Sequence, residues 1–315
     1  MRIAIIDNIH AALAETLAGA GHECVLLNHL STAELAKALI DAEGIIVRSK
    51  HLDRELLKEL SRLRFIGRVG AGLENIDRKF CEEKEILLLN APEGNRDGVG
   101  ELCVAQVLIL LKHIVRANDQ IHKGLWLREE NRGSDLQGRT IGIIGYGNMG
   151  SAFAEKLKGF GVRILAHDKY RSGFGNDQVE ECDLDRLLGE SDVISLHLPL
   201  NAETKHYANA AFFDRIGKPV HFLNTSRGAI VDTGALLDAI DKGTLIGAAL
   251  DVLEFERSDL SGLDPSIKPE VQQRLFASDR VLLTPHIAGV THEGAEKMAR
   301  ILARKIIEAF PDESN

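Results

Sequence analysis

The sequence predicts an α/β protein with two parallel-sheet domains, and three observations carry that prediction. Short apolar runs with strand character alternate with helical patterns along nearly the whole chain. A turn-rich break at residues 90–95 interrupts this alternation. Glycines at G-x-G-x-x-G spacing, Gly145, Gly147 and Gly150, follow one of the apolar runs. Strands that alternate with helices form parallel sheets covered on both faces.

Composition bounds the class of protein. With 315 residues, the chain is long enough for two domains of ordinary size. A net charge of -9 argues against a nucleic-acid partner or an acidic membrane surface. The four cysteines are far apart and form no C-x-x-C pair, so we expect reduced thiols in a cytoplasmic protein and no metal site. No signal peptide and no membrane-spanning run are expected.

The first part of the chain predicts a flavodoxin-like, doubly wound sheet. Expected strands lie at residues 3–6, 24–27, 44–47, 65–69 and 86–89. Helical patterns separate them at residues 10–20, 31–40, 53–60 and 76–83. Ligands bind at the carboxyl ends of the strands in such sheets, where residues 48–50 and 70–75 are expected.

Two long helices are expected outside this sheet. The first, roughly residues 98–122, is apolar on much of its circumference, which favours a subunit contact in a homodimer or homotetramer. The second, about residues 292–310, is amphipathic and is expected to return to the first domain. We therefore expect a substrate-binding domain of residues 1–95 with 291–315, and a second domain of residues 96–290, which carries the glycine motif and would bind the cofactor.

The glycine motif predicts a dinucleotide site of Rossmann type. Residues 140–144 form an apolar strand, residues 151–160 have helical spacing, and residues 162–166 form the next strand. Gly145 permits the turn, Gly147 lets a pyrophosphate approach the backbone, and Gly150 allows close packing of helix on strand. The helix N-terminus offers its free N–H groups to the phosphates.

Asp168, just past the second strand, indicates NAD rather than NADP. A carboxylate there accepts hydrogen bonds from the adenosine ribose and repels a 2′-phosphate. Lys169, the next residue, opposes this preference because a cation attracts phosphate.

Further along the chain four more strands are expected, and polar side chains that could take part in chemistry follow the last three of them. Strands are expected at residues 193–198, 221–224, 246–252 and 281–283, with a helix at 234–241, and residues 254–277 are expected to be irregular. Removing a hydride from an alcohol carbon also requires a base, and His286 suits this because imidazole exchanges protons near neutral pH. Glu256 is expected on the other ring nitrogen, Arg227 on a substrate carboxylate, and Asp251 near the nicotinamide amide.

The order of the motifs resembles the D-isomer-specific 2-hydroxyacid dehydrogenases. The resemblance rests on V-G-A-G at 69–72, N-I-D at 75–77, the glycine motif, H-L-P-L at 197–200, T-S-R-G at 225–228, A-L-D-V at 249–252 and T-P-H at 284–286. It implies NAD-dependent interconversion of a D-2-hydroxy acid and its 2-keto acid. It also implies a catalytic set of Arg227, Glu256 and His286, with Glu256 chosen over Glu254 for its spacing from Arg227. Arg257 stands where the family usually has proline.

The same resemblance implies which residues line the cofactor. Beside the three glycines, Asp168 and Asp251, these are Asn148, Met149, His197, Leu198, Pro199, Thr225, Ser226, Ala288 and Gly289.

Within the family, residues 47–49 and 91–95 resemble the substrate loops of phosphoglycerate dehydrogenases. That branch interconverts 3-phospho-D-glycerate and 3-phosphohydroxypyruvate, on the route to serine. A phosphate requires cations beyond Arg227, and the expected substrate-binding residues are Arg48, Ser49, Lys50, Ala71, Gly72 and Arg128, the last from this chain or a partner subunit. A serine-binding regulatory domain is not expected.

Two alternatives stay open. The same chemistry serves a glyoxylate or hydroxypyruvate reductase or a D-lactate dehydrogenase, because the small-domain loops select the substrate. An NAD(H)-sensing co-repressor-like protein would use the fold without catalysis. The complete set of Arg227, Glu256 and His286 disfavours that sensor.

Overall fold

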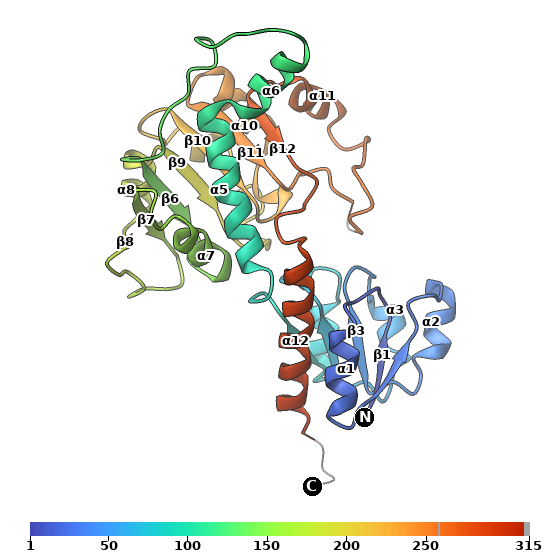
Figure 1. The fold of residues 1–315 in the computed structure, drawn as a ribbon. Coiled ribbons are helices and arrows are strands. Elements are labelled where there is room, and N and C mark those ends of the chain that lie inside the picture. Colours follow the sequence, from blue (N-terminus) through green and yellow to red (C-terminus); the bar gives the residue numbers. More distant parts are fainter. Residues whose placement is uncertain (258, 312–315) are drawn as a thin grey trace. The chain divides into compact units, whose positions relative to one another are not determined.

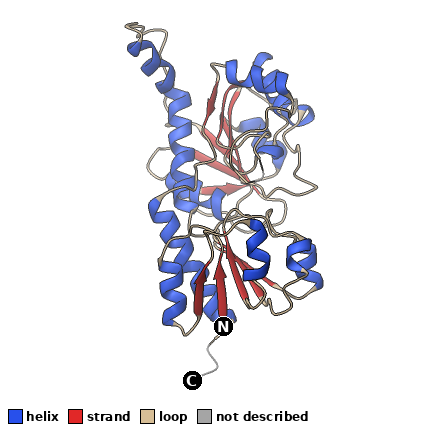
Figure 2. Cartoon of the chain, turned by 90° about the vertical axis from the view of Figure 1, so that its right-hand side faces the viewer, coloured by secondary structure: helices blue, strands red, loops and turns tan. Residues whose placement is uncertain are grey.

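The computed structural model describes residues 1–257 and 259–311, except for the side chains of residues 32 and 33. The chain forms two compact units, each with its own sheet (Figures 1 and 2). Unit 1 comprises Met1–Arg96, Arg257–Ser261 and the segment from Val290 onward, and unit 2 comprises Asp97–Glu256 and Gly262–Gly289. The inclusion of Arg257–Ser261 in unit 1 is not predicted from the sequence.

Unit 1 is built on a five-stranded parallel sheet in the order β2-β1-β3-β4-β5. Its strands are β1 (Arg2–Ile5), β2 (Glu23–Leu26), β3 (Gly44–Val47), β4 (Phe65–Arg68) and β5 (Leu87–Asn90). Its helices are α1 (Ala12–Gly19), α2 (Thr32–Ala38), α3 (Arg54–Leu57), α4 (Arg78–Glu83) and α12 (His292–Ala309). This order confirms the predicted flavodoxin-like, doubly wound sheet.

The last helix belongs to the core of unit 1. Leu302 and Ile306 on its apolar stripe are buried with Phe65 and the residues of α1. Lys305 on the same helix donates to the carbonyl of Asn90 at 2.9 Å. A Cβ added to Gly94 would lie 2.5 Å from the backbone nitrogen of Met298, so only glycine fits there. The chain leaving β5 is therefore fixed against α12.

Unit 2 is built on a seven-stranded parallel sheet in the order β12-β11-β10-β9-β6-β7-β8. Its strands are β6 (Thr140–Ile144), β7 (Arg163–His167), β8 (Val179–Glu181), β9 (Val193–Leu196), β10 (Val220–Asn224), β11 (Leu245–Leu250) and β12 (Val281–Leu283). Its helices are α5 (Arg96–Lys112), α6 (Ile114–His122), α7 (Asn148–Lys156), α8 (Leu184–Glu190), α9 (Ala210–Phe213), the 3₁₀ turn η1 (Gly228–Ile230), α10 (Thr233–Asp241) and α11 (Pro269–Ala277). The doubly wound fold predicted for this region is confirmed.

Both faces of the unit 2 sheet are covered, which explains its continuous apolar strands. On one face, Ile194 and Phe222 pack with side chains of α8, α9, α10 and α11. On the other face, Val193 and Leu223 pack with side chains of α5 and α7. Successive residues of a strand point to opposite faces, so each strand serves both cores.

The expected single helix at residues 98–122 is wrong. His113 adopts a left-handed backbone conformation, with φ of 54°, and separates α5 from α6 at a bend of 62°. The apolar run in the sequence does not indicate this break, because the bend arises from the backbone conformation of a single residue. α6 has no buried residue, whereas α5 is largely packed on the sheet.

Three further elements differ from expectation. The region 254–277 is not irregular throughout, since α11 occupies its end and begins with Pro269 in the first helical turn, where proline is tolerated. The short edge strand β8 was missed because three residues carry too little periodicity. α7 begins at Asn148 rather than at residue 151, directly after its N-cap, Gly147.

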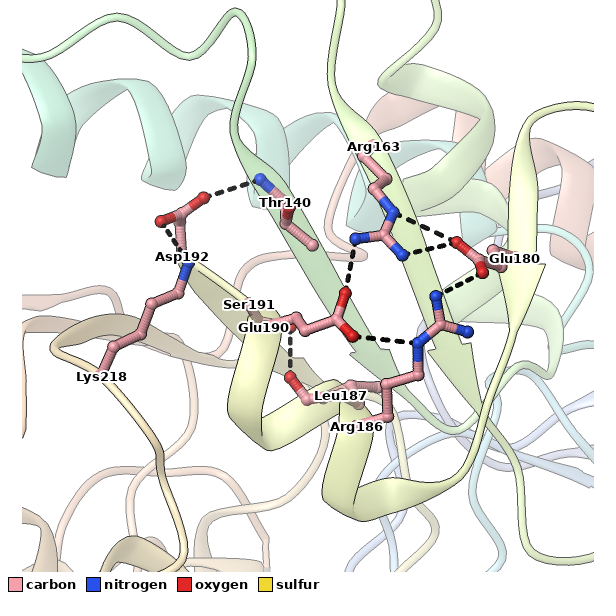
Figure 3. A network of polar contacts seen from close by, with 9 residues as sticks. All are labelled: Thr140, Arg163, Glu180, Arg186, Leu187, Glu190, Ser191, Asp192 and Lys218. Atoms are coloured by element: carbon pink, nitrogen blue, oxygen red, sulfur yellow. Dashed lines mark hydrogen bonds and ion pairs between the residues drawn. The ribbon is translucent and has the colours of Figure 1, made fainter.

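Four alternating charges tie the edge strand β8 to its neighbours (Figure 3). Arg163 of β7 donates to Glu180 at 2.7 Å and to Glu190 at 2.6 Å. Arg186 of α8 donates to Glu180 at 2.5 Å and to Glu190 at 3.0 Å. Each carboxylate therefore bridges both arginines, and the closed ring is a network, which is the arrangement in which surface charges contribute to stability.

Replacing Glu180 with Gln should lower the melting temperature at neutral pH but have little effect in acid. Arg163 and then Arg186 hold the pKa of Glu180 below its ordinary 4.5. A depressed pKa stabilises the folded state above the unfolded value and loses that effect as the pH falls through the folded value. Thermal unfolding from neutral pH down to about pH 3 tests this. Glu129→Gln, which removes a single exposed pair with Arg132, is the control, and a pH-independent difference for Glu180→Gln contradicts the prediction.

In the part of the chain that the structure describes, no single helix has the length and apolar composition to cross a bilayer. The bent pair α5 and α6 meets these two criteria only when its helices are counted together.

Candidate active site

The turn after β6 has the backbone that a dinucleotide site requires. Gly145 has a φ of 91°, and an added Cβ would lie 2.4 Å from the carbonyl oxygen of His197. A Cβ on Gly150 would lie 2.1 Å from the carbonyl oxygen of Gly145. A Cβ on Gly147, in contrast, would meet nothing within 4 Å. Two glycines therefore permit close packing, and the third leaves room for a ligand.

The first turn of α7 faces the same space. Asn148 and Met149 begin the helix directly after Gly147, so its first N–H groups are available to an anion. Space above Gly147 and a helix N-terminus together fit the pyrophosphate of a dinucleotide.

Asp168 lies just after β7 and fixes two loops. One carboxylate oxygen accepts from the backbone N–H of Tyr146 at 2.8 Å, within the glycine turn. The other accepts from Tyr170 at 2.9 Å and Arg171 at 3.1 Å. Because a carboxylate has about four acceptor positions, one remains for a ribose hydroxyl.

The loop after β9 forms the floor of the turn. Leu198 lies beside Gly145, since an added Cβ there would be 3.1 Å from the leucine side chain. His197 contacts the hydroxyl of Ser195 at 2.9 Å through Nε2, and its ring packs against that of Phe153. Burial lowers the pKa of His197 to about 4, so the ring is neutral at pH 7. The His197 side chain therefore has a packing role next to the turn. Pro199, which follows Leu198, is exposed.

Thr225 and Ser226 follow β10, and the side chains of Asn224 and Cys103 contact them. The side-chain oxygen of Asn224 accepts from the backbone of Ser226 at 3.0 Å and from its hydroxyl at 2.7 Å. The hydroxyl of Thr225 lies 3.4 Å from the sulfur of Cys103. Burial raises the pKa of Cys103 to about 12, so this thiol is protonated and unreactive.

The structure brings Glu256 and His286 into direct contact. Nδ1 of His286 lies 2.9 Å from one carboxylate oxygen of Glu256. The other oxygen accepts from the backbone N–H of Leu253 at 2.7 Å, which fixes the carboxylate in its own loop. The His286 side chain is 30% exposed, so a ligand can reach it.

Asp251 holds the backbone that carries His286. Its buried carboxylate accepts from the hydroxyl of Thr284 at 2.6 Å and from the backbone of Ile287 at 2.9 Å and Ala288 at 2.8 Å. His286 itself has a φ of 54°, a conformation that a non-glycine residue adopts only when its surroundings fix it. The carboxylate expected near the nicotinamide amide is thus largely engaged by the turn that ends at Gly289.

Arg227 belongs to the same carboxyl edge, because β10, β11 and β12 are neighbours in the sheet. Its guanidinium donates to the carbonyl of Ser226 at 2.6 Å, and its own carbonyl accepts from Asn224 at 3.0 Å. A Cβ on Gly228 would lie 2.0 Å from the carbonyl carbon of Leu253. The loop of Arg227 therefore packs directly against the loop that contains Glu256.

Glu254, the other acidic candidate, has a different environment. Its carboxylate contacts His206 at 2.8 Å, Lys268 at 2.7 Å and the backbone of Thr233 at 3.1 Å. Burial alone would raise the pKa of Glu254, but Lys268, Thr233 and His206 lower it below 4.5. Glu254 is therefore a charged anchor of the loop and does not contact His286.

In unit 1, the candidate substrate residues lie at the carboxyl edge of its own sheet. A single oxygen of Asp7 accepts from the backbone N–H groups of Arg48, Ser49 and Lys50 at 2.6, 2.8 and 3.2 Å. The Arg48 side chain is exposed, whereas the ammonium of Lys50 donates to the carbonyl of Leu30 at 3.2 Å. The loop is rigid, and of its two cations only Arg48 points into solvent.

Arg68, at the end of β4, lies at the same edge and is not among the residues expected there from the sequence. Its Nε donates to the carbonyl of Arg48 at 3.2 Å, and a Cβ on Gly70 would lie 2.3 Å from its guanidinium. The carbonyl of Ala71, next to Gly72, accepts from Asn90 at 2.5 Å. The available signal was the position of Arg68 at a strand end, just before the glycine pair.

Arg128 lies on the exposed loop after α6, in unit 2. The structure of the chain by itself gives this side chain no contact with the other candidate residues.

Comparisons with known proteins agree with this geometry. The model of the D-isomer specific 2-hydroxyacid dehydrogenase family, NAD binding domain, matches residues 104–288. Hydroxypyruvate reductase from Thermotoga maritima is 34% identical over 285 residues, which cover 90% of each chain. D-3-phosphoglycerate dehydrogenase from Archaeoglobus fulgidus is 32% identical over 310 residues, which are 98% of this chain and 57% of that protein.

Solved structures show the same fold. The crystal structure of D-lactate dehydrogenase from Aquifex aeolicus, complexed with NAD and lactic acid, has a TM-score of 0.81. The identity is 29%, and the alignment covers 98% of this chain and 95% of that one.

A glycine turn for a dinucleotide and a histidine–glutamate pair at the same carboxyl edge of one sheet are typical of an oxidoreductase of the α/β class. The chain belongs to the D-isomer specific 2-hydroxyacid dehydrogenase family and is an NAD-dependent enzyme of that family.

Proposed function

We propose that the chain interconverts 3-phospho-D-glycerate and 3-phosphohydroxypyruvate, a step of serine biosynthesis. The observation that carries the chemistry is the contact of His286 with Glu256, at the sheet edge where Arg227 also lies. The observation that supports a phosphorylated substrate is the rigid loop of unit 1 with the exposed Arg48.

In this proposal His286 is the acid–base residue. A bound NAD would supply the hydride acceptor for C2 of the hydroxy acid. His286 takes the hydroxyl proton on Nε2, because Nδ1 is engaged by Glu256. The negative charge of Glu256 stabilises the imidazolium that results, and the return reaction gives the proton back to the keto oxygen.

Arg227 is proposed to bind the substrate carboxylate. A guanidinium matches a carboxylate in two parallel hydrogen bonds, and its charge polarises a neighbouring carbonyl oxygen. The side-chain amide of Asn224 holds the backbone carbonyl of Arg227, and the carbonyl of Ser226 accepts from its guanidinium. The phosphate is assigned to cations of unit 1, with Arg48 first, Arg68 second, and Ser49, Lys50, Ala71 and Gly72 forming the loops around it. Arg128, from this chain or a partner subunit, is the remaining candidate.

A steady-state comparison of NADH oxidation with a panel of 2-keto acids tests the substrate. Phosphohydroxypyruvate should have the highest kcat/KM, above hydroxypyruvate, glyoxylate and pyruvate. A preference for an unphosphorylated acid would favour the second candidate function, a hydroxypyruvate, glyoxylate or D-lactate enzyme, which the 34% identity to hydroxypyruvate reductase supports. Binding of NADH without oxidation by any 2-keto acid would instead favour the NAD(H)-sensing alternative.

The Arg48→Ala variant should raise the KM for phosphohydroxypyruvate by about 10- to 100-fold, the range for loss of one charge-assisted bond. The KM for hydroxypyruvate should change little, because that substrate has no phosphate. Arg62→Ala, which removes an exposed arginine before β4, is the matched control. An equal effect of Arg48→Ala on both substrates would exclude a phosphate contact.

We also propose a homodimer or homotetramer in the cytoplasm. Support for the assembly comes from the exposed apolar side chains of α6 and the loop after it: Ile114, Val115, Ile121, Leu125 and Trp126. All four cysteines are free, which suits a reducing compartment. Sedimentation of the purified chain measures the assembly.

A further inference from the structure

Two loops flank the glycine turn of unit 2. The sheet order β9-β6-β7 places the carboxyl ends of β7 and β9 on either side of β6 (Figure 1). Residues 168–171 follow β7, and residues 197–204 follow β9. In a site of this type the adenosine half of the cofactor lies at this edge, so these loops are its immediate surroundings.

Lys169 poses a problem for NAD selectivity. It stands directly after Asp168, next to the position of the ribose 2′-hydroxyl, where a cation would attract the 2′-phosphate of NADP. Asp168 already accepts three backbone N–H groups, which diminishes its ability to repel that phosphate. The second cation of the loop, Arg171, is directed to the glycine turn and donates to the carbonyl of Tyr146 at 2.5 Å. Lys169 is therefore the cation of this loop whose charge could attract a 2′-phosphate.

Glu203, from the opposite loop, takes up that charge. One of its carboxylate oxygens pairs with the ammonium of Lys169, and the other accepts from the hydroxyl of Tyr170. The ammonium also lies 5.5 Å from the centre of the Tyr170 ring. Lys169 is thus held between a carboxylate and an aromatic face, which partly offsets its charge beside Asp168.

The position of Glu203 is fixed independently of this pair. The side-chain oxygen of Asn201 accepts from the backbone N–H groups of Glu203 at 2.9 Å and Thr204 at 3.0 Å. The hydroxyl of Thr204 donates to the carbonyl of Pro199 at 2.5 Å. This turn presents the carboxylate to Lys169 without any further ordering of the backbone.

We infer that Glu203 is a cofactor-specificity residue, which favours NAD(H) over NADP(H) by holding Lys169 away from a 2′-phosphate. This rests on the dinucleotide site at the glycine turn. Removing the carboxylate would release a cation at the position where a phosphate binds and would also remove a like charge from its surroundings. Both effects favour NADPH, and neither alters the 2′-hydroxyl contact of NADH.

Equilibrium titration of the full chain with NADH and NADPH, without substrate, tests the inference. The Glu203→Gln variant should lower the Kd for NADPH about tenfold relative to that for NADH, as expected for one charge a few ångströms from a phosphate at the protein surface. In the double variant with Lys169→Gln, most of this gain should disappear, because the released cation is absent.

Asp214→Asn is the matched control. Asp214 lies shortly before β10, and its exposed carboxylate pairs with Lys242. This variant should leave the ratio of the two dissociation constants unchanged. A ratio in Glu203→Gln within about twofold of the wild-type value, or a gain that persists in the double variant, overturns the inference. Wild-type chain that binds neither nucleotide overturns the dinucleotide site as well, so the two failures are distinguishable.

Discussion

In the His286→Asn variant, the kcat for reduction of a 2-keto acid should be about 10²- to 10⁴-fold lower than in the wild type. This is the usual contribution of a positioned acid–base group. An amide cannot exchange a proton at neutral pH, so the step assigned to Nε2 would be left to water. Asparagine is chosen because it tolerates the left-handed backbone that His286 adopts, with φ of 54°. The turn held by Asp251 should therefore persist.

His113→Asn is the matched control for this prediction. His113 has the same φ of 54° but lies at the bend between α5 and α6, away from the sheet edge. Its kcat should match that of the wild type. NADH binding by both variants should be unchanged in a fluorescence titration, which separates a chemical defect from a folding defect. Wild-type turnover by His286→Asn would remove this residue from the mechanism.

The Glu256→Gln variant should lower kcat by about 10²- to 10⁴-fold, as when a carboxylate that orients a catalytic histidine becomes an amide. Two effects add. The amide lacks the negative charge that stabilises the imidazolium, and its NH₂ group can donate to Nδ1, which selects the wrong tautomer of His286. The contact affected is the 2.9 Å one between Nδ1 and the carboxylate.

Glu254→Gln is the control that separates the two neighbouring glutamates. Its carboxylate anchors the loop through Lys268, Thr233 and His206 and does not contact His286. This variant should lower the melting temperature and change kcat less than Glu256→Gln does. The opposite ranking, with the greater loss of kcat in Glu254→Gln, would exchange the assignments of the two residues.

The elements around the glycine motif were predictable because their physical requirements are local. The turn at Gly145 needs a positive φ, the approach at Gly147 needs an absent side chain, and both appear as glycine in the sequence. Parallel strands are buried on both faces, so their apolar runs identify them. Polar residues that follow such strands meet at one edge, which is why a glutamate of the loop after β11 could be paired with His286, and the family resemblance selected Glu256 over Glu254.

Other features depend on contacts between distant segments, which no local pattern encodes. The bend at His113 is a change of one backbone conformation inside an apolar run. The three donors that the turn after β12 supplies to the Asp251 carboxylate come from residues 33 to 37 positions further along the chain. The pairing of Lys169 with Glu203 joins loops 34 residues apart in sequence.

The placement of β12 has a consequence for how the enzyme fails on heating. This strand has three residues and lies at the margin of its sheet, where among the described residues it pairs with β11 alone, yet the proposed acid–base residue, His286, follows it closely. Marginal strands open before the centre of a sheet does. The Asp251 carboxylate accepts three hydrogen bonds from the turn after β12, and these oppose such opening. We therefore expect activity to be lost on heating before the rest of the domain unfolds.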